Sequence, residues 1–313
     1  MNKQTQLLRD VRFALQRGDF VGALASLEKV AKLAEEQEAW GAAGRHLGNL
    51  ALTYYRLGNI KQALQYFEQA LDFARRDGDH MTENGLLGNM GNILRESKRF
   101  DDAITYLNDA LRLAQQLGDT RGRGIWLTNL GLVYDDLRQP EDAIPLHQEA
   151  VRIAREMHDE TARYSRLINL GNSYEAQGDY LSAAQQFQQV LAIDDAHGKR
   201  EEVAYRTGVL GNLYAEAARQ QLPADAAYAH FSTALDYYGK AMNLMRAIGD
   251  QASEAEVIRS IGDVLADAGQ YDDAKQYLDV AQQMFSALGL TQQATASKTT
   301  LKRLIEFLEQ DQA

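Results

Sequence analysis

Asparagine side chains recur in this sequence with a spacing that points to peptide recognition. A carboxamide donates and accepts hydrogen bonds, which matches the alternating N–H and C=O groups of an extended main chain. Four asparagines follow one another at intervals of 40 residues, and three more lie three positions further along their repeats: Asn49, Asn89, Asn129 and Asn169, then Asn92, Asn172 and Asn212. Because positions i and i+3 share a helix face, we expect these amides to form a ladder that contacts a bound peptide. The alternative is that they bond only within or between neighbouring repeats.

Charged side chains in phase with this ladder change sign along the chain. The early repeats present Arg45, Arg56 and Arg95, which complete the candidate peptide-binding set. The later repeats present acidic residues, with Glu96 and Arg259 as the exceptions: Asp135, Asp136, Glu175, Glu216, Glu256, Asp263 and Asp267. We expect the acidic part or C-terminal carboxylate of a bound segment to lie toward the early repeats and its basic part toward the late ones. The alternative is a solvated face whose charges only keep the protein soluble.

Other residue types show no arrangement suited to catalysis or metal binding. The six histidines are spread over several repeats without an H-x-x-x-H or H-E-x-x-H pair, and there is no cysteine. No G-x-S-x-G motif or P-loop occurs, and the glycines of 118–124 fall between expected helices rather than after a strand. We therefore expect a non-enzymatic protein without catalytic residues, metal or cofactor.

Composition narrows the class of protein and its partners. The 313 residues are 45% apolar and 25% charged, as in folded soluble proteins, and only 3 prolines and 24 glycines interrupt regular structure, which favours helices. The net charge of -11 argues against nucleic acid as a general partner. No apolar run approaches the roughly 18 residues of a membrane helix, and the first residues lack an apolar signal region. The sequence therefore predicts a cytoplasmic protein with no membrane insertion.

A repeat of 40 residues organises the chain. Five alanines stand 40 residues apart, and Ala63, Ala103 and Ala143 among them begin an A-x-x-[YFLH]-x-x-x-A unit: Ala23, Ala63, Ala103, Ala143 and Ala183. In one repeat, apolar residues at spacings of three and four predict helices over 85–98 and 100–117, antiparallel because the connection is short. A small residue recurs in each first helix and would let the pair approach closely: Ala51, Gly91, Gly131, Gly171, Gly211 and Gly262. Gly85, Gly88 and Gly208 would leave room for ligand side chains or relieve helix crowding.

These strings resemble the tetratricopeptide repeats, in a 40-residue form similar to that of LGN/Pins-type adaptors and bacterial arrays. The resemblance rests on Leu47-Gly48-Asn49-Leu50, on Asn129-Leu130-Gly131 with Tyr134, and on Asn169-Leu170-Gly171-Asn172 with Tyr174, each followed by an alanine-rich second helix. It implies an all-α, right-handed superhelical solenoid of about seven antiparallel helix pairs with a C-terminal capping helix. It further implies that the first helices line a concave groove, in which LGN-type relatives hold a partner's main chain with asparagines at these positions.

The repeats divide a single expected domain, 1–313. Their expected bounds are 5–38, 41–80, 81–120, 121–160, 161–200, 201–250 and 252–289, with a cap at 291–313. The sixth repeat carries 11 extra residues, and we expect 217–227 to form a protruding helical hairpin, with Pro223 placed where its second helix could begin. This hairpin is either a tolerated insertion or an extra docking edge. Pro140 is expected to open a helix, and Pro145 to kink it.

The function expected from these residues is a protein–protein interaction scaffold or adaptor that binds a peptide or partner-protein segment in its groove. One alternative is a sensor in which a small peptide changes a second surface, which compaction on peptide addition would reveal. Another is a structural protein that self-assembles into a homo-oligomer through its irregular first repeat, which a concentration-dependent mass would reveal.

Overall fold

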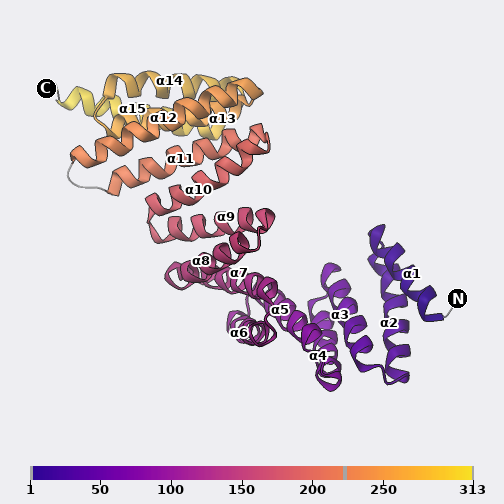
Figure 1. The fold of residues 1–313 in the computed structure, drawn as a ribbon. Coiled ribbons are helices and arrows are strands. Elements are labelled where there is room, and N and C mark those ends of the chain that lie inside the picture. Colours follow the sequence, from indigo (N-terminus) through magenta and orange to yellow (C-terminus); the bar gives the residue numbers. More distant parts are fainter. Residues whose placement is uncertain (1–2, 221–223, 312–313) are drawn as a thin grey trace. The chain divides into compact units, whose positions relative to one another are not determined.

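Helices account for all the regular structure in the described part of the chain. The computed structural model describes residues 3–220 and 224–311 (Figure 1). The helices are α1 (Lys3–Gln16), α2 (Phe20–Glu36), α3 (Trp40–Arg56), α4 (Ile60–Asp77), α5 (His80–Glu96), α6 (Phe100–Leu117), α7 (Thr120–Asp136), α8 (Pro140–Glu156), α9 (Glu160–Gln177), α10 (Tyr180–Ala196), α11 (Arg200–Gln220), α12 (Ala224–Ile248), α13 (Gln251–Asp267), α14 (Tyr271–Ala287) and α15 (Thr291–Asp311). Seven successive pairs and one C-terminal helix confirm the predicted all-α fold.

Two compact units make up the chain, residues 1–162 and 163–313, with the boundary inside α9. The expected single domain stays a prediction. Within each unit the helices of a pair contact each other and the first helix of the next pair, as α3 does with α4 and α5. None of the helices in residues 3–220 and 224–311 has the length and apolar character needed to cross a membrane.

A left-handed turn residue separates the helices every 20 positions from Gly18 to Gly198, and again from Gly249 to Gly289. Gly78, after α4, has φ 71°, and Lys98, after α5, has φ 59° although it is not glycine. An aspartate or asparagine follows several of these turns, and the carboxylate of Asp79 accepts a hydrogen bond from the Thr82 amide at 3.1 Å. This cap explains why α5 begins at His80, five residues before the start expected from its apolar stripe.

Close pairing of the helices depends on the predicted small residues of the first helices. A Cβ built on Gly91 would lie 2.6 Å from Leu107 of the following helix. In unit 2, a Cβ built on Gly171 would lie 2.9 Å from Phe187, and one built on Gly262 would lie 2.8 Å from Leu278. The large residue stands 16 positions after the small one, so one ridge enters one groove in each pair. The expected close approach is confirmed.

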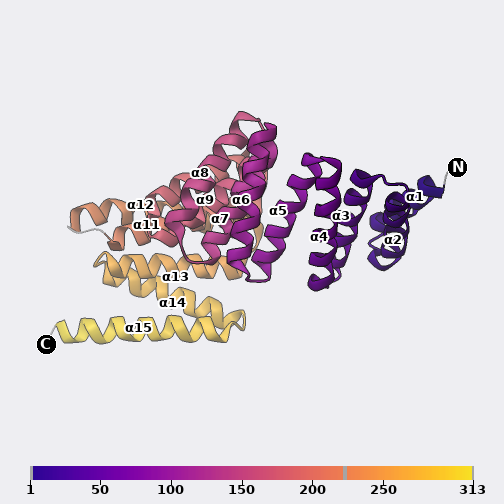
Figure 2. The ribbon, with the colours of Figure 1, turned by 90° about the horizontal axis from the view of Figure 1, so that it is seen from below.

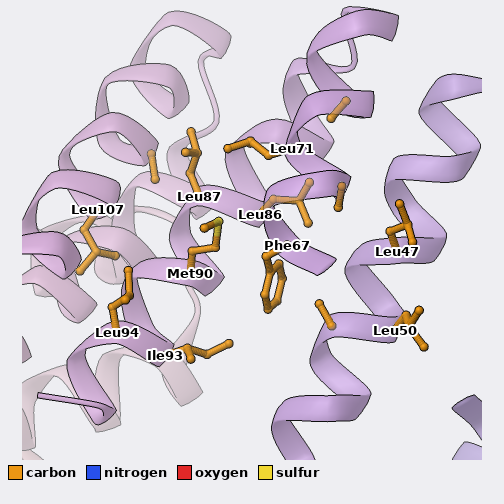
Figure 3. Close-up of a cluster of buried hydrophobic side chains, with 14 of the residues drawn as sticks. Leu47, Leu50, Phe67, Leu71, Leu86, Leu87, Met90, Ile93, Leu94 and Leu107 are labelled. Atoms are coloured by element: carbon orange, nitrogen blue, oxygen red, sulfur yellow. The ribbon is translucent and has the colours of Figure 1, made fainter. Parts of the chain in front are cut away.

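The core of unit 1 fills the space between successive pairs. Phe67 of α4 is fully buried, and Figure 3 places it between Leu50 on α3 and Met90 on α5. Leu50 and Met90 are each 1% exposed. A side chain from a second helix therefore joins two first helices, so that each repeat buries its apolar face against the next.

Gly88 corrects part of the expectation about open glycines. A Cβ on Gly88 would lie 2.3 Å from the indole ring of Trp126, whereas Gly85 on the same helix has nothing within 4 Å. Trp126 is buried, and its Nε1 donates to Oδ1 of the buried Asn84 at 2.8 Å. Gly88 therefore makes room for Trp126 rather than for a ligand side chain.

This contrast predicts opposite effects for two alanine substitutions in α5. We expect Gly85→Ala to raise the free energy of unfolding by about 0.5–1 kcal/mol, because it removes backbone freedom without a clash. We expect Gly88→Ala to lower it by about 1–3 kcal/mol, because the fixed indole overpacks against the new methyl group. Urea denaturation of the two variants checks both signs, and equal shifts would contradict the packing that we describe.

The sixth pair has longer helices than its neighbours, as the insertion predicts. Helix α11 has 21 residues and α12 has 25, against 17 in α13 and α14. The part of the expected hairpin at 221–223, including Pro223, lies outside the described residues. Pro140 opens α8 as expected, and α8 continues through the exposed Pro145, so the kink stays a prediction. The last helix, α15, lies along α14 (Figure 2) and buries Ala294 and Leu304.

Candidate functional site

The first helices of successive pairs contact one another within each unit. Such contacts join α3 to α5 and α5 to α7 in unit 1, and α11 to α13 in unit 2. Side chains on these helices therefore lie side by side. We call the surface formed by α3, α5 and α7 in unit 1, and by α9, α11 and α13 in unit 2, the first-helix face. All ten predicted peptide-binding residues lie on first helices, Asn49 and the early members in unit 1, Asn169 and the later ones in unit 2.

The asparagines of unit 1 are accessible to different degrees. Asn49 is exposed, and Asn89, Asn92 and Asn129 are half-buried. Asn92 Nδ2 donates to Glu96 Oε1 one turn away at 3.2 Å, so this amide has a local partner. The structure thus brings four of the predicted amides onto the first-helix face of unit 1, and their contact with a peptide stays a prediction.

The arginines of unit 1 already have partners. Arg45 Nη1 pairs with Asp79 Oδ2, and Arg95 Nη1 pairs with Asp136 Oδ2 at 2.9 Å. The Arg56 guanidinium lies 5.5 Å from the centre of the Phe20 ring. A ligand carboxylate would have to exchange with these partners, although exposed ion pairs contribute only about 0–1 kcal/mol each. The arginines at the expected basic end of the face are therefore less available to a ligand carboxylate than the sequence suggests.

In unit 2 the predicted residues include Asn212, which lines a hollow between α11 and α13. Asn169 is half-buried, whereas Asn172 and Asn212 are exposed. The hollow measures about 270 Å³ and is lined by Tyr205, Gly208, Val209, Asn212, Tyr238, Met245, Ser253, Glu256, Val257 and Ser260. This volume is just below the range of about 300–1,000 Å³ that is usual for small-molecule sites, and it suits one peptide side chain.

Local geometry keeps this hollow open and orients its polar wall. A Cβ built on Gly208 would lie 3.9 Å from Ala241 Cβ and from Val257 Cγ2, which is an ordinary contact distance, so Gly208 leaves room for about one methyl group above its backbone. The hydroxyl of the buried Tyr238 donates to Asn212 Oδ1 at 2.7 Å, and burial is the main cause that raises the Tyr238 pKa to about 12. The hydrogen bond occupies the acceptor end of the Asn212 amide, and its donor end is suited to a peptide carbonyl.

Carboxylates dominate the charge on the first-helix face of unit 2. Burial raises the pKa of Glu175, and the nearby charge of Glu216 raises it further. Burial also raises the pKa of Asp263, against the opposing effect of Arg259, whose Nη1 lies 2.8 Å from Asp263 Oδ2. Arg219 crosses from α11 to α13 and pairs with Asp267 at 2.7 Å. A cationic ligand group would favour the charged form of these carboxylates, which burial disfavours.

The raised pKa of Glu175 predicts a pH-dependent effect of its neutralisation. A carboxyl whose folded-state pKa is raised stabilises the fold below its unfolded pKa, and this stabilisation is lost as the pH rises through the folded pKa. We therefore expect Glu175→Gln to gain stability relative to the wild type between about pH 4 and pH 7, by no more than about 0.5 kcal/mol, because this side chain is only partly buried and solvent screens its charge. Urea denaturation at several pH values checks this, and Asp236→Asn, an exposed carboxylate on α12, serves as control. A difference that does not change with pH would contradict the interpretation.

Several residues of the hollow were not predicted from the sequence. Tyr205 is 63% exposed and stands one helical turn before Gly208, so an exposed aromatic followed by glycine at i+3 was the available signal. Val257, Ser253 and Ser260 come from α13, and their approach to α11 depends on how the lengthened sixth pair packs. Among the described residues, no group of three or more histidine or carboxylate side chains could hold a metal ion.

Stacked helix pairs with a continuous first-helix face define an α-helical repeat protein, a class that presents extended surfaces to protein partners. A family model described as tetratricopeptide repeat matches residues 12–76 and 82–156. A second model with the same description matches residues 165–193. The chain belongs to the tetratricopeptide repeat family, whose repeats serve as protein–protein interaction scaffolds.

Solved structures share this fold at low sequence identity. The C-terminal part of a TPR repeat-containing protein from Cytophaga hutchinsonii matches with a TM-score of 0.63 and 16% identity over 95% of this chain and 98% of that one. A signal transduction ATPase with a tetratricopeptide repeat sensor from Pyrococcus horikoshii gives 0.61 and 15% over 99% and 50%. The apo form of RapI gives 0.59 and 13% over 96% and 100%. No curated protein matches the sequence.

Proposed function

We propose that the protein is a non-enzymatic scaffold or adaptor that binds an extended segment of a partner protein along its first-helix faces. The observation that carries this proposal is the hollow between α11 and α13, in which Asn212 stands beside an apolar floor kept open by Gly208. A floor for one side chain next to an amide for the main chain is the combination that an extended peptide requires. The other asparagines supply similar amides along each unit.

The chemistry of the hollow describes its ligand. Val209 and Val257 favour an apolar side chain, and the exposed ring of Tyr205 offers it a further contact surface. Glu256 at the same hollow, together with the excess of carboxylates on this face, favours a lysine or arginine nearby in the ligand. One docked segment of this kind typically binds with about micromolar affinity, or about −8 kcal/mol.

Panning of a random 12-residue peptide library on the intact protein tests the proposal. We expect the selected peptides to bind Gly208→Leu at least about tenfold more weakly, because the leucine fills the space meant for the anchoring side chain. Gly239→Leu is the matched control, since Gly239 lies on α12 with nothing within 4 Å and does not line the hollow. Equal affinity for the wild type and both variants would remove the hollow from the proposal.

We also propose a cytoplasmic location and no nucleic-acid partner. The net charge of -11 and the acidic first-helix face of unit 2 both oppose binding to phosphates. Fractionation of the source cells checks the location, and a gel-shift assay at low salt checks the expected lack of binding to nucleic acid.

A further inference from the structure

A second hollow lies in unit 1 beside the second helices α2 and α4. None of the predicted peptide-binding residues lines it. It measures about 700 Å³ and opens between α2 and α4. Ala31 of α2 and Leu47 and Leu50 of α3 contribute its buried apolar lining. Tyr66 and Phe73 of α4 complete it, and because they stand seven residues apart on one helix, the hollow extends over about two turns, or roughly 10 Å.

Stacked aromatic rings hold Tyr66 and Phe73, the two aromatic walls of the hollow, in place. Tyr66 lies against Tyr54 with ring centres 5.2 Å apart, and Phe73 lies against Trp40 at 5.5 Å. The Arg76 guanidinium covers the Trp40 ring at 3.8 Å. An aromatic surface held in this way loses little side-chain entropy when a ligand covers it.

Carboxylates border this apolar hollow on both sides. Glu28 and Glu35 line it from α2, and Glu68 and Asp72 line it from α4. Lys32 is the one basic residue among those that line the hollow. Its Nζ lies 4.0 Å from Oε1 of Glu36, a residue that does not line the hollow. Apolar lining between two acidic edges is complementary to a ligand with an apolar stripe between two cationic edges.

The corresponding hollow in unit 2 shows that this charge is not a consequence of repeat packing. It lies between α12 and α14, measures about 280 Å³, and is lined by apolar residues such as Val280 together with Arg246. No carboxylate is among its lining residues. The corresponding hollows of the two units thus differ in size and in the sign of the charge on their lining residues, so the carboxylates are a feature of the unit 1 hollow itself.

We propose that the groove between α2 and α4 binds a basic amphipathic helix of a partner protein. The apolar stripe of the helix covers Tyr66 and Phe73 above the buried Leu47 and Leu50, and its flanking lysines or arginines meet the carboxylates of α2 and α4. A helix satisfies its own main-chain hydrogen bonds, so it suits walls that offer side-chain carboxylates and apolar surface rather than main-chain partners. Because this site is distinct from the first-helix faces, the protein can hold two partner segments of different chemistry at once.

A synthetic helical peptide tests this proposal. The probe is an 18-residue fluorescent peptide with leucines at i, i+3, i+4 and i+7 positions and lysines on both flanks, and its binding to the full chain is followed by anisotropy. Two variants of adjacent exposed residues change the net charge equally: Glu35→Lys lines the groove, and Glu36→Lys does not. We expect Glu35→Lys to weaken binding about tenfold, and Glu36→Lys less than about threefold.

Matched peptides distinguish the groove from general attraction to an acidic protein. We expect no binding when glutamates replace the lysines, and a loss of at least about tenfold when serines replace the leucines. Equal effects of the two protein variants, or equal binding of the serine peptide, would overturn the proposal in favour of nonspecific charge attraction. Absence of binding to the wild type at low salt would overturn it as well. Circular dichroism of each variant verifies the fold.

Discussion

Replacing Asp194 with alanine is expected to destabilise unit 2 by about 3–5 kcal/mol at neutral pH. Asp194 is completely buried on α10, at a position where the preceding repeats carry alanine. Its carboxylate accepts from Arg206 Nε at 2.8 Å, and from Lys199 Nζ and the Tyr164 hydroxyl. The alanine variant leaves the guanidinium of Arg206, itself only 12% exposed, without its buried counter-charge. Denaturation in urea measures the change.

Two further variants separate this ion pair from a simple change of volume. Asp195→Ala removes the exposed neighbouring carboxylate and should change stability by less than about 0.5 kcal/mol. Asp194→Ala/Arg206→Leu should recover about 0.5–3 kcal/mol relative to the single variant, because it also removes the unpaired charge. A single variant no less stable than Asp195→Ala would show that the pair does not stabilise the fold.

The effect of Asp194→Ala should depend on pH in a definite direction. Burial alone would raise the Asp194 pKa, but hydrogen bonds from Arg206, Tyr164 and Lys199 outweigh burial and lower it from its ordinary value of 3.8. A lowered folded-state pKa stabilises the fold above the unfolded value, and this stabilisation is lost as the pH falls through the folded value. The difference between the wild type and the variant should therefore narrow below about pH 4.

Replacing Phe67 with alanine should destabilise unit 1 by about 3–5 kcal/mol. Phe67 is fully buried between the first helices of two successive pairs (Figure 3), so its loss opens a cavity that both pairs border. Guanidinium denaturation followed by circular dichroism measures the effect. Phe13→Ala is the matched control in the same unit, because Phe13 is 61% exposed and its ring faces the Arg17 guanidinium at 5.2 Å. Similar losses for the two variants would contradict the core that we describe.

The fold could be predicted from the sequence because the same apolar spacing and the same small residue recur in successive repeats. Spacings of three and four define each helix face, and the small residue that recurs in the first helices, as at Gly91, indicates the close pairing. Helix starts were less visible, because the cap at Asp79 lies before the apolar stripe of α5 begins. The division into two units was not predicted, since the 40-residue pattern continues through residue 162 without a break.

The candidate site was predicted only in part, for a physical reason. The sequence identifies Asn212 and the side chains that share its face, but it does not show that Arg45 and Arg95 are already paired across neighbouring helices. The sequence left two roles open for Gly88, because Trp126, which decides between them by covering it, belongs to the next repeat. Both hollows depend on side chains from more than one helix, and spacing along one chain does not report such distances.

Binding of a panned peptide to an Asn212 variant tests the central claim most directly. Asn212→Ala removes the amide whose donor end is suited to a peptide carbonyl, and Asn243→Ala removes an exposed amide on the second helix α12 of the same pair. We predict that fluorescence anisotropy of the labelled peptide will show a loss of about five- to tenfold for Asn212→Ala, the worth of one hydrogen bond, and no change for Asn243→Ala. Unchanged affinity for both variants, or equal losses, would contradict binding of the main chain on the first-helix face.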